Sequence, residues 1–130
     1  MTTRTGGVLV VEDDESLRHI LGHYLRGQGI GVAEAASAED AARILEGGLT
    51  PELIVLDINL PGDNGWDLLR GPAFVSAGRP PVVIASALPV SPKRLSEFGI
   101  AGYLPKPFPV ETLVATIERL LNPGRSSEEA

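Results

Sequence analysis

Short apolar runs recur along the chain and have the length and composition of buried β-strands. Four of them are residues 8–11 (VLVV), 53–56 (LIVL), 82–85 (VVIA) and 102–104 (GYL), and residues 31–35 (GVAEA) form a weaker fifth. They are rich in valine, isoleucine and leucine and do not alternate with polar residues. This pattern is typical of strands that are buried on both faces of a sheet.

Helical patterns lie between these runs. In the first pattern, apolar residues recur at the spacing of one helical face, which is formed by Leu17, Ile20, Leu21, Tyr24 and Leu25. Ser37 is expected to cap a second helix, which ends at Gly47 and Gly48. Short helices are expected from about residue 65 and over residues 92–98. The clearest helix carries an apolar face made of Val110, Leu113, Val114, Ile117, Leu120 and Leu121.

The order of these elements indicates the fold. Strand and helix alternate five times, and this alternation produces a parallel sheet with helices on both faces. The length of 130 residues suits one domain. The sequence therefore predicts a doubly wound α/β domain with a flavodoxin-like, five-stranded parallel sheet in the order 2-1-3-4-5. We assign this domain to residues 7–122 and expect residues 123–130 to form a polar tail.

Composition narrows the classes of function. The formal net charge is −6, and an acidic protein is repelled by phosphates, so direct binding to nucleic acid is not expected. The absence of cysteine excludes disulfides and thiolate metal sites. No apolar run reaches the length of a membrane span or of a signal-peptide core. We therefore expect a soluble cytoplasmic protein that does not contact membranes.

Chemically active side chains follow the predicted strands. Glu12 and Asp13 follow the first run, Asp57 follows the run at 53–56, Ser86 follows the next, and Lys106 comes shortly after residues 102–104. Because ligands of such sheets bind beyond the carboxyl ends of the strands, these side chains are expected to meet at one edge. The alternative is that each residue has no role in chemistry and only caps a helix or lies in solvent. This alternative can account for any one of these residues, but less well for all of them at the same predicted edge.

The charges of these residues indicate a metal site. Glu12, Asp13 and Asp57 bring three carboxylates together against one ammonium group from Lys106. A divalent cation would balance the remainder, and a set of oxygen ligands without histidine or cysteine favours Mg²⁺. A carboxylate beside a hard cation, a hydroxyl and a lysine forms a plausible site for phosphoryl transfer. Asp57 is the candidate nucleophile.

Lys106 is one of only two lysines in the chain and stands between Pro105 and Pro107. Prolines restrict the backbone, so we expect the ammonium group to be directed back over the edge of the sheet. A cis peptide bond between Lys106 and Pro107 would serve this purpose. A rigid loop after an edge strand, with no role in chemistry, is the alternative.

Four segments together resemble a known family. They are VLVVEDDESLR (8–18), LIVLDINLPGDNGWDLL (53–69), VVIASA (82–87) and GYLPKPF (102–108). In this order and spacing they resemble the receiver domain of two-component response regulators, which has a CheY-like fold. The resemblance covers residues 7–122, nearly the whole chain.

The resemblance implies a role for each residue of the predicted edge. Asp57 would accept a phosphoryl group from the phosphohistidine of a histidine kinase or phosphotransfer protein. Glu12, Asp13 and Asp57 would hold Mg²⁺, together with the backbone carbonyl of Asn59. Lys106 would pair with the phosphoryl group.

Ser86 and Tyr103 would form the switch, in which the hydroxyl moves to the phosphoryl group and the aromatic ring changes rotamer. The resemblance implies a signalling protein rather than an enzyme, apart from Mg²⁺-dependent self-phosphotransfer and autodephosphorylation. A downstream protein partner is expected, whose identity the sequence does not give.

Two segments depart from the family pattern. The segment 88–101 is shorter than usual for the family and contains two prolines, so the helix there is expected to be short or displaced. Because this segment lies on the usual output surface of the family, dimerisation through that surface is in doubt. Residues 70–81 suggest a truncated helix with a loose exit. The sequence leaves open the oligomeric state, the phosphoryl lifetime and continuation into an output domain. It also leaves open the alternative of a receiver-fold module that binds its partner without phosphorylation.

Overall fold

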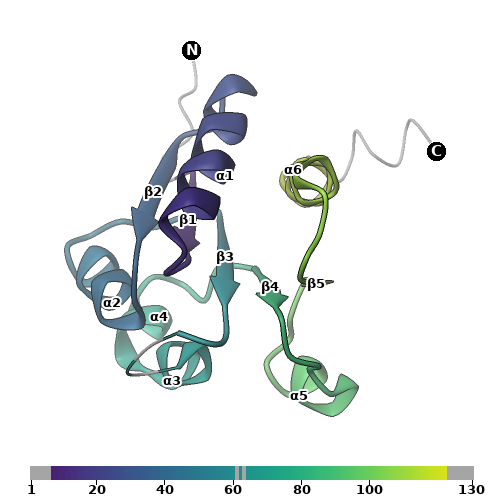
Figure 1. Cartoon of the computed structure of the whole chain (residues 1–130). Coiled ribbons are helices and arrows are strands. Elements are labelled where there is room, and N and C mark those ends of the chain that lie inside the picture. The colour runs from purple at the N-terminus through teal and green to yellow at the C-terminus, as the bar shows by residue number, and fades with distance from the viewer. Residues whose placement is uncertain (1–6, 61, 63, 123–130) are drawn as a thin grey trace.

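A five-stranded parallel sheet organises the part of the chain that this computed structural model describes, which is residues 7–60, 62 and 64–122. The strand order is β2-β1-β3-β4-β5, as predicted. The strands are β1 (Val8–Val11), β2 (Val32–Ala35), β3 (Leu53–Asp57), β4 (Val82–Ser86) and β5 (Gly102–Pro105). In Figure 1 the arrowheads of β1, β2, β3 and β4 point toward the same edge of the sheet.

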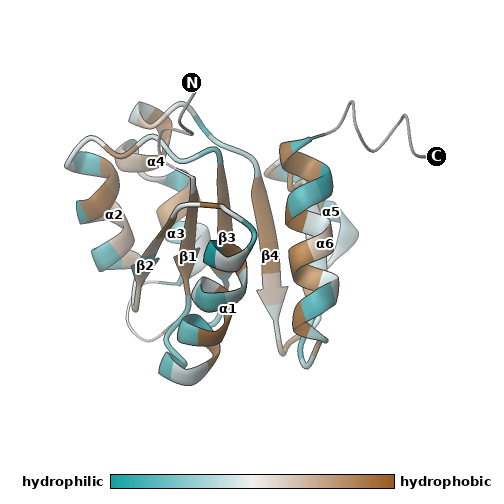
Figure 2. Cartoon of the chain, turned by 90° about the horizontal axis from the view of Figure 1, so that it is seen from above, coloured by the Kyte–Doolittle hydropathy of each residue, from teal (hydrophilic) through white to brown (hydrophobic). Residues whose placement is uncertain are grey.

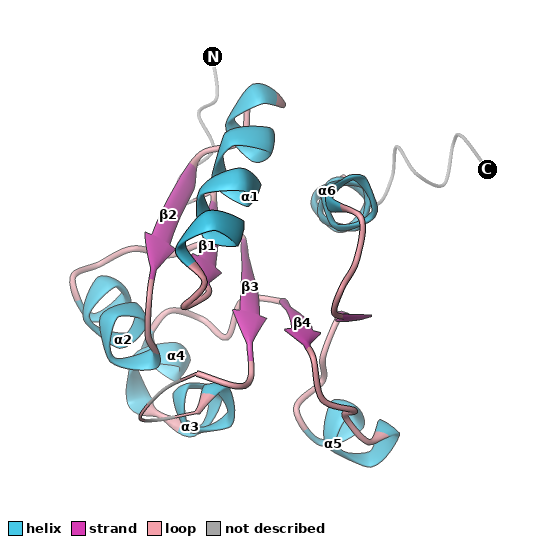
Figure 3. Cartoon of the chain, in the orientation of Figure 1, coloured by secondary structure: helices cyan, strands magenta, loops and turns pink. Residues whose placement is uncertain are grey.

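Helices cover both faces of the sheet (Figure 3). On one face lie α1 (Glu15–Gly27) and α6 (Val110–Leu121). On the other lie four shorter helices: α2 (Ala38–Glu46), α3 (Gly65–Arg70), α4 (Pro72–Ser76) and α5 (Pro92–Glu97). The described chain is therefore a doubly wound α/β fold in three layers.

The central strands are apolar throughout because both of their faces are buried. Leu9 and Val11 of β1 pack toward α2 and α3, whereas Val8 and Val10 pack toward α1 and α6. All four side chains are fully buried. Figure 2 shows β1, β3 and β4 as brown, hydrophobic ribbons between helices that carry teal, hydrophilic residues on their outer sides. Alternating side chains thus supply two cores, one on each side of the sheet.

The helices begin at the capping residues that the sequence offers. The Asp14 side chain accepts a hydrogen bond from the backbone N–H of Leu17 at the start of α1, and Ser37 accepts one from Asp40 in α2. Asn64 forms a reciprocal capping box with Asp67. Side-chain acceptors at these positions satisfy backbone donors that the first helical turn leaves free.

The apolar face predicted for α1 is wider than the face that is buried. Leu21 and Leu25 are buried, but Ile20 is 45% exposed and Tyr24 is 42% exposed. The helix packs on β1 and β2 and against α6, and these neighbours cover only the central part of its apolar stripe. The helix is confirmed, and its apolar face extends beyond the buried surface at Ile20 and Tyr24.

The helix between β3 and β4 is broken into two. It stops at Arg70, Gly71 takes an extended conformation, and Pro72 begins α4. Proline is well suited to the first turn of a helix because no backbone donor is needed there. The sequence predicted a truncated helix here, and the structure adds the short α4. The short helix expected over 92–98 is α5, which also begins at a proline, Pro92.

The predicted polar tail at 123–130 lies outside the described residues, so the boundary of the domain at 7–122 stays a prediction. Over the described part of the chain, no helix has both the length and the apolar character needed to cross a bilayer.

Gly65 is expected to be intolerant of a side chain. A Cβ atom at this position would lie 2.9 Å from Ile58 Cδ1 and 3.1 Å from the Asp57 carbonyl oxygen. We expect Gly65→Ala to lower the free energy of unfolding by about 1–2 kcal/mol, because the backbone after β3 must shift. Gly27→Ala is the control, since nothing lies within 4 Å of a Cβ there. Equal melting temperatures for the two variants in thermal denaturation would contradict this account.

Candidate functional site

Polar side chains gather where the strands end. Glu12 directly follows β1, Asp57 is the last residue of β3, Ser86 is the last of β4, and Lys106 follows β5. Glu12 and Asp57 are only 3% and 4% exposed, and Ser86 is 1% exposed. The structure therefore brings the predicted residues of four strands to one edge, as the parallel topology requires.

Lys106 joins two of the carboxylates. Its Nζ atom lies 2.7 Å from Glu12 Oε1 and 3.2 Å from Asp57 Oδ2. The Lys106 backbone N–H donates to the Ser86 carbonyl at 2.8 Å, which extends the pairing of β5 with β4 up to the lysine itself. The Lys106–Pro107 peptide bond is cis, the form considered from the sequence. The ammonium group is directed over the edge of the sheet, as expected.

Three carboxylates form a cluster that could hold a metal ion. One oxygen from each of Glu12, Asp13 and Asp57 lies within 4.8 Å of the others, and the Asp13 side chain is exposed. The backbone holds one oxygen of Glu12 and one of Asp57: Asp14 N–H donates to Glu12 Oε2, and Asn59 N–H donates to Asp57 Oδ1. A set of oxygen donors with one open side suits a hard divalent cation.

Crowding of these charges alters their protonation. Burial raises the pKa of Glu12 from 4.5 to about 7, and the neighbouring Asp57 charge adds to this, although hydrogen bonds from Lys106 and Asp14 act in the opposite direction. Burial alone would lower the pKa of Lys106, but its hydrogen bonds and the charges of Glu12 and Asp57 raise it above its usual value. The lysine is thus firmly protonated, while Glu12 of the metal-free site changes its protonation near neutral pH.

The hydroxyl of Ser86 is engaged by the loop that follows it. Ser86 Oγ donates to the Leu88 carbonyl at 2.9 Å and accepts from the Leu88 N–H at 3.1 Å. It also accepts a hydrogen bond from the Asn59 side-chain amide at 3.1 Å. Asn59 therefore links the end of β3 to the end of β4, because its backbone N–H binds Asp57.

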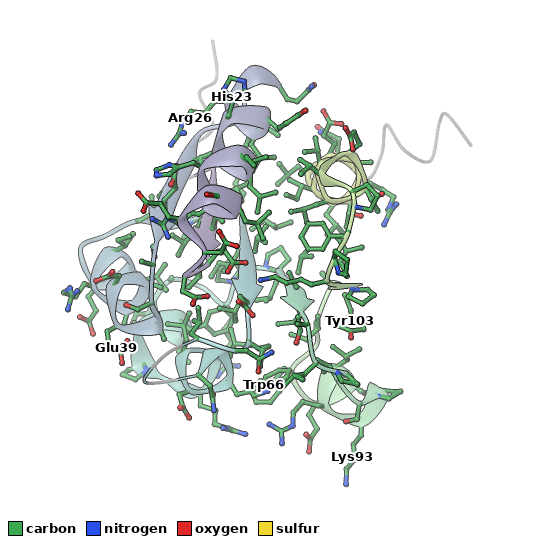
Figure 4. All side chains as sticks on the ribbon, viewed as in Figure 1. His23, Arg26, Glu39, Trp66, Lys93 and Tyr103 are labelled. Atoms are coloured by element: carbon green, nitrogen blue, oxygen red, sulfur yellow. The ribbon has the colours of Figure 1, made fainter. Side chains whose placement is uncertain are left out.

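Tyr103 lies on the strand beside Ser86. It is paired in register with Ile84, two residues before Ser86, so both side chains belong to the face of the sheet covered by α5. The Tyr103 side chain is partly buried against the core of that face. Figure 4 shows it on the β5 side of the molecule, on the opposite side of β4 from β3.

An aromatic pair joins α3 to α5. The Trp66 and Phe98 rings lie 4.8 Å apart between centroids, and two arginines stack on them, Arg94 over Trp66 and Arg70 over Phe98. Figure 4 shows Trp66 between the two helices. Beside it is a hollow of about 350 Å³, whose lining includes Ser86, Trp66 and Arg94. Sequence reasoning missed this pair, since its members are far apart in the chain.

A second feature that the sequence did not reveal is the position of Arg18. Its Nη1 atom donates to the Glu12 backbone carbonyl at 2.7 Å, and its Nε lies 3.4 Å from Glu34 Oε1. Glu34, on β2, is also contacted by Arg26 at 3.2 Å and by His19 at 3.3 Å. The sequence pattern around Arg18 does not indicate that its side chain binds the backbone carbonyl of Glu12, six residues earlier.

Comparison with known proteins assigns the family. A family model described as the response regulator receiver domain matches residues 8–118. The chain belongs to this family. The resemblance noted from the sequence is thereby confirmed, and the strand order 2-1-3-4-5 is the one expected for this CheY-like fold.

Individual relatives agree with this assignment. The receiver domain is 35% identical to the protein PetR of Rhodobacter capsulatus over 116 residues, which are 88% of this chain and 48% of PetR. It is 33% identical to the transcriptional regulatory protein CpxR of Escherichia coli, over 94% of this chain and 52% of CpxR. The chain thus spans about half the length of these curated relatives. The non-phosphorylated HemR receiver domain from Leptospira biflexa superposes with a TM-score of 0.77 at 30% identity, covering 88% of this chain and 92% of that one.

Proposed function

We propose that this receiver domain accepts a phosphoryl group on Asp57 from the phosphohistidine of a histidine kinase or phosphotransfer protein, with Mg²⁺ bound to Glu12, Asp13 and Asp57. The backbone carbonyl of Asn59 would complete the protein ligands. The observation that carries the proposal is the position of the Asp57 carboxylate, buried at the end of β3 and in contact with the Lys106 ammonium at 3.2 Å.

The chemistry requires a nucleophile and a means to offset charge. An Asp57 carboxylate oxygen attacks phosphorus, the new O–P bond forms, and the P–N bond of the donor breaks so that its electron pair returns to the imidazole. Lys106 is already beside Asp57 Oδ2 and would pair with the arriving phosphoryl oxygens. The Asn59 N–H holds the other carboxylate oxygen, so the nucleophile is oriented before the donor arrives.

The donor set of the site supports the choice of cation. The cluster of Glu12, Asp13 and Asp57 supplies carboxylate oxygens from two strand ends, and Lys106 occupies one oxygen of Glu12 and one of Asp57. When bound, Mg²⁺ would offset negative charge on the transferred group.

Ser86 is the residue through which phosphorylation would be sensed. Its hydroxyl hydrogen now points to the Leu88 carbonyl, so donation to a phosphoryl oxygen requires that this bond break. The Leu88 backbone would then be released, and Tyr103 would adjust on the same face of the sheet. A population shift of the surface around α5, β5 and α6 is the expected signal to a downstream partner.

Incubation with phosphoramidate and Mg²⁺ tests the proposal, because this reagent contains a P–N bond like that of phosphohistidine. We expect intact-protein mass spectrometry to detect the addition of one phosphoryl group, and omission of Mg²⁺ to prevent it. A protein that stays unmodified at saturating Mg²⁺ would support the alternative of a module that binds its partner without phosphorylation.

The stabilising effect of Mg²⁺ is expected to grow with pH. The pKa of Glu12 is raised in the folded protein, so its proton stabilises the metal-free fold below about pH 4.5, and this contribution is lost as pH rises through about 7. Mg²⁺ must displace that proton at low pH but not at high pH. Thermal denaturation should therefore show a larger Mg²⁺-induced rise in melting temperature at pH 8 than at pH 6. Glu12→Gln should weaken this pH dependence; equal rises in the parent at both values would contradict it.

A further inference from the structure

The peptide unit between Glu12 and Asp13 is held from the helix above it. Arg18 of α1 donates from Nη1 to the Glu12 carbonyl at 2.7 Å, and its side chain is only 13% exposed. The N–H of Glu12 is held as well, since it donates to the Ala35 carbonyl of β2 at 3.0 Å. Both backbone polar groups of Glu12 therefore have fixed partners.

This bond acts on the residue that follows. The Glu12 carbonyl belongs to the same rigid peptide plane as the Asp13 N–H, so its orientation sets the direction in which the chain enters Asp13. On the far side, Asp14 is fixed as the cap of α1. The Asp13 side chain itself is exposed, so burial does not fix its conformation. The position of its carboxylate thus depends on the backbone at Glu12.

Arg18 is in turn anchored on the sheet. Its Nε lies 3.4 Å from Glu34 Oε1, and the Glu34 side chain is 17% exposed. Arg26 reaches the other oxygen of Glu34 at 3.2 Å, but its guanidinium does so from the end of α1 that is remote from the acidic cluster (Figure 4). Glu34 therefore forms ion pairs with two arginines, but only Arg18 of these two also contacts the backbone of Glu12.

We propose that Arg18 is a positioning residue for the cation site, which fixes the peptide between Glu12 and Asp13 and so holds the two carboxylates in a geometry that binds a divalent cation. The inference rests on the cation site of the proposed function. Groups that orient metal ligands from behind commonly contribute about 10–100-fold to metal affinity.

If only charge mattered, loss of Arg18 would change the Mg²⁺ affinity in the opposite direction. Removing a positive charge beside three carboxylates makes their surroundings more negative, which strengthens the attraction for a cation. If Arg18 acted only through its charge, Arg18→Met would therefore bind Mg²⁺ more tightly. If it acts by positioning, the same variant binds more weakly.

The test is titration of Arg18→Met with Mg²⁺ by isothermal calorimetry, in the absence of any phosphoryl donor. We expect the dissociation constant to rise about tenfold. Arg26→Met is the matched control, because it removes the same charge and an ion pair with the same Glu34 but touches no backbone of the site. Its affinity should stay within about twofold of the parent. Tighter binding by Arg18→Met, or equal changes in both variants, would overturn the proposal.

Arg18→Lys covers the case in which Arg18→Met does not fold. The lysine keeps the charge but lacks the planar fork of donors with which Arg18 contacts the Glu34 carboxylate from Nε and the Glu12 carbonyl from Nη1. A severalfold loss of Mg²⁺ affinity is expected, and an unchanged affinity would refute the role of Arg18. Because Mg²⁺ binding is measured without phosphorylation, a parent protein that binds Mg²⁺ but gains no phosphoryl group would refute the proposed function and leave this result standing.

Discussion

Asp57→Asn is expected to gain no phosphoryl group from phosphoramidate under conditions that modify the parent completely. The amide oxygen is a far weaker nucleophile than the carboxylate. Among the described carboxylates, Glu12 is the only other one that is buried at a strand end and in contact with Lys106. Burial raises the pKa of Glu12 to about 7, and a protonated carboxyl group is a weak nucleophile, so Glu12 is not expected to replace Asp57. Mass spectrometry after incubation measures the result directly.

The fold of this variant should survive. Asp57→Asn removes one of three crowded carboxylates, and Lys106 keeps its shorter contact with Glu12 at 2.7 Å. Melting temperature should therefore remain close to that of the parent. Asp14→Asn is the matched control: it makes the same change two residues from Glu12, and asparagine also caps helices. Phosphoryl uptake should persist in Asp14→Asn, and uptake that persists in Asp57→Asn would disprove the assigned acceptor.

Lys106→Met is expected to slow phosphoryl uptake by about 100-fold, the usual consequence of removing one preorganised group that offsets developing charge. The variant loses the ammonium that contacts Asp57 and Glu12, whose side chains are only 5% and 4% exposed. Two buried carboxylates without their cation also destabilise the metal-free fold. The melting temperature should fall, and Mg²⁺ should restore part of the loss.

The only other lysine of the chain provides the control. Lys93 is exposed on α5, away from the acidic cluster (Figure 4), so Lys93→Met makes the same chemical change at a distance. Initial rates of phosphoryl uptake at saturating Mg²⁺ should match the parent for Lys93→Met. A Lys106→Met protein that is folded and reacts at the parental rate would show that its ammonium has no part in the transfer.

The location of the candidate site could be predicted from the sequence mainly because the sheet is parallel. Once residues 8–11, 53–56, 82–85 and 102–104 are identified as strands, the polar residues after them must meet at one edge. Each strand was recognisable since burial on both faces requires an uninterrupted apolar run. The positions of Glu12, Asp57, Ser86 and Lys106 follow from that alone.

Features that depend on side chains meeting across the fold were not predictable in this way. The Trp66–Phe98 pair and the bond from Arg18 to the Glu12 carbonyl join residues whose local patterns say nothing of each other. The exposure of Ile20 has a related cause, because periodicity marks an apolar stripe but not the width of the surface that covers it. Neighbouring elements decide that width.

The stacking of Trp66 on Phe98 has a practical consequence. Trp66 is the sole tryptophan of the chain, and its ring contacts a residue at the end of α5 while it lines the hollow next to Ser86. Indole emission is sensitive to its surroundings, so a displacement of α5 relative to α3 alters the fluorescence of this one residue. The protein therefore carries an intrinsic optical probe of the region beside Ser86, where the proposed switch would act, without any attached dye.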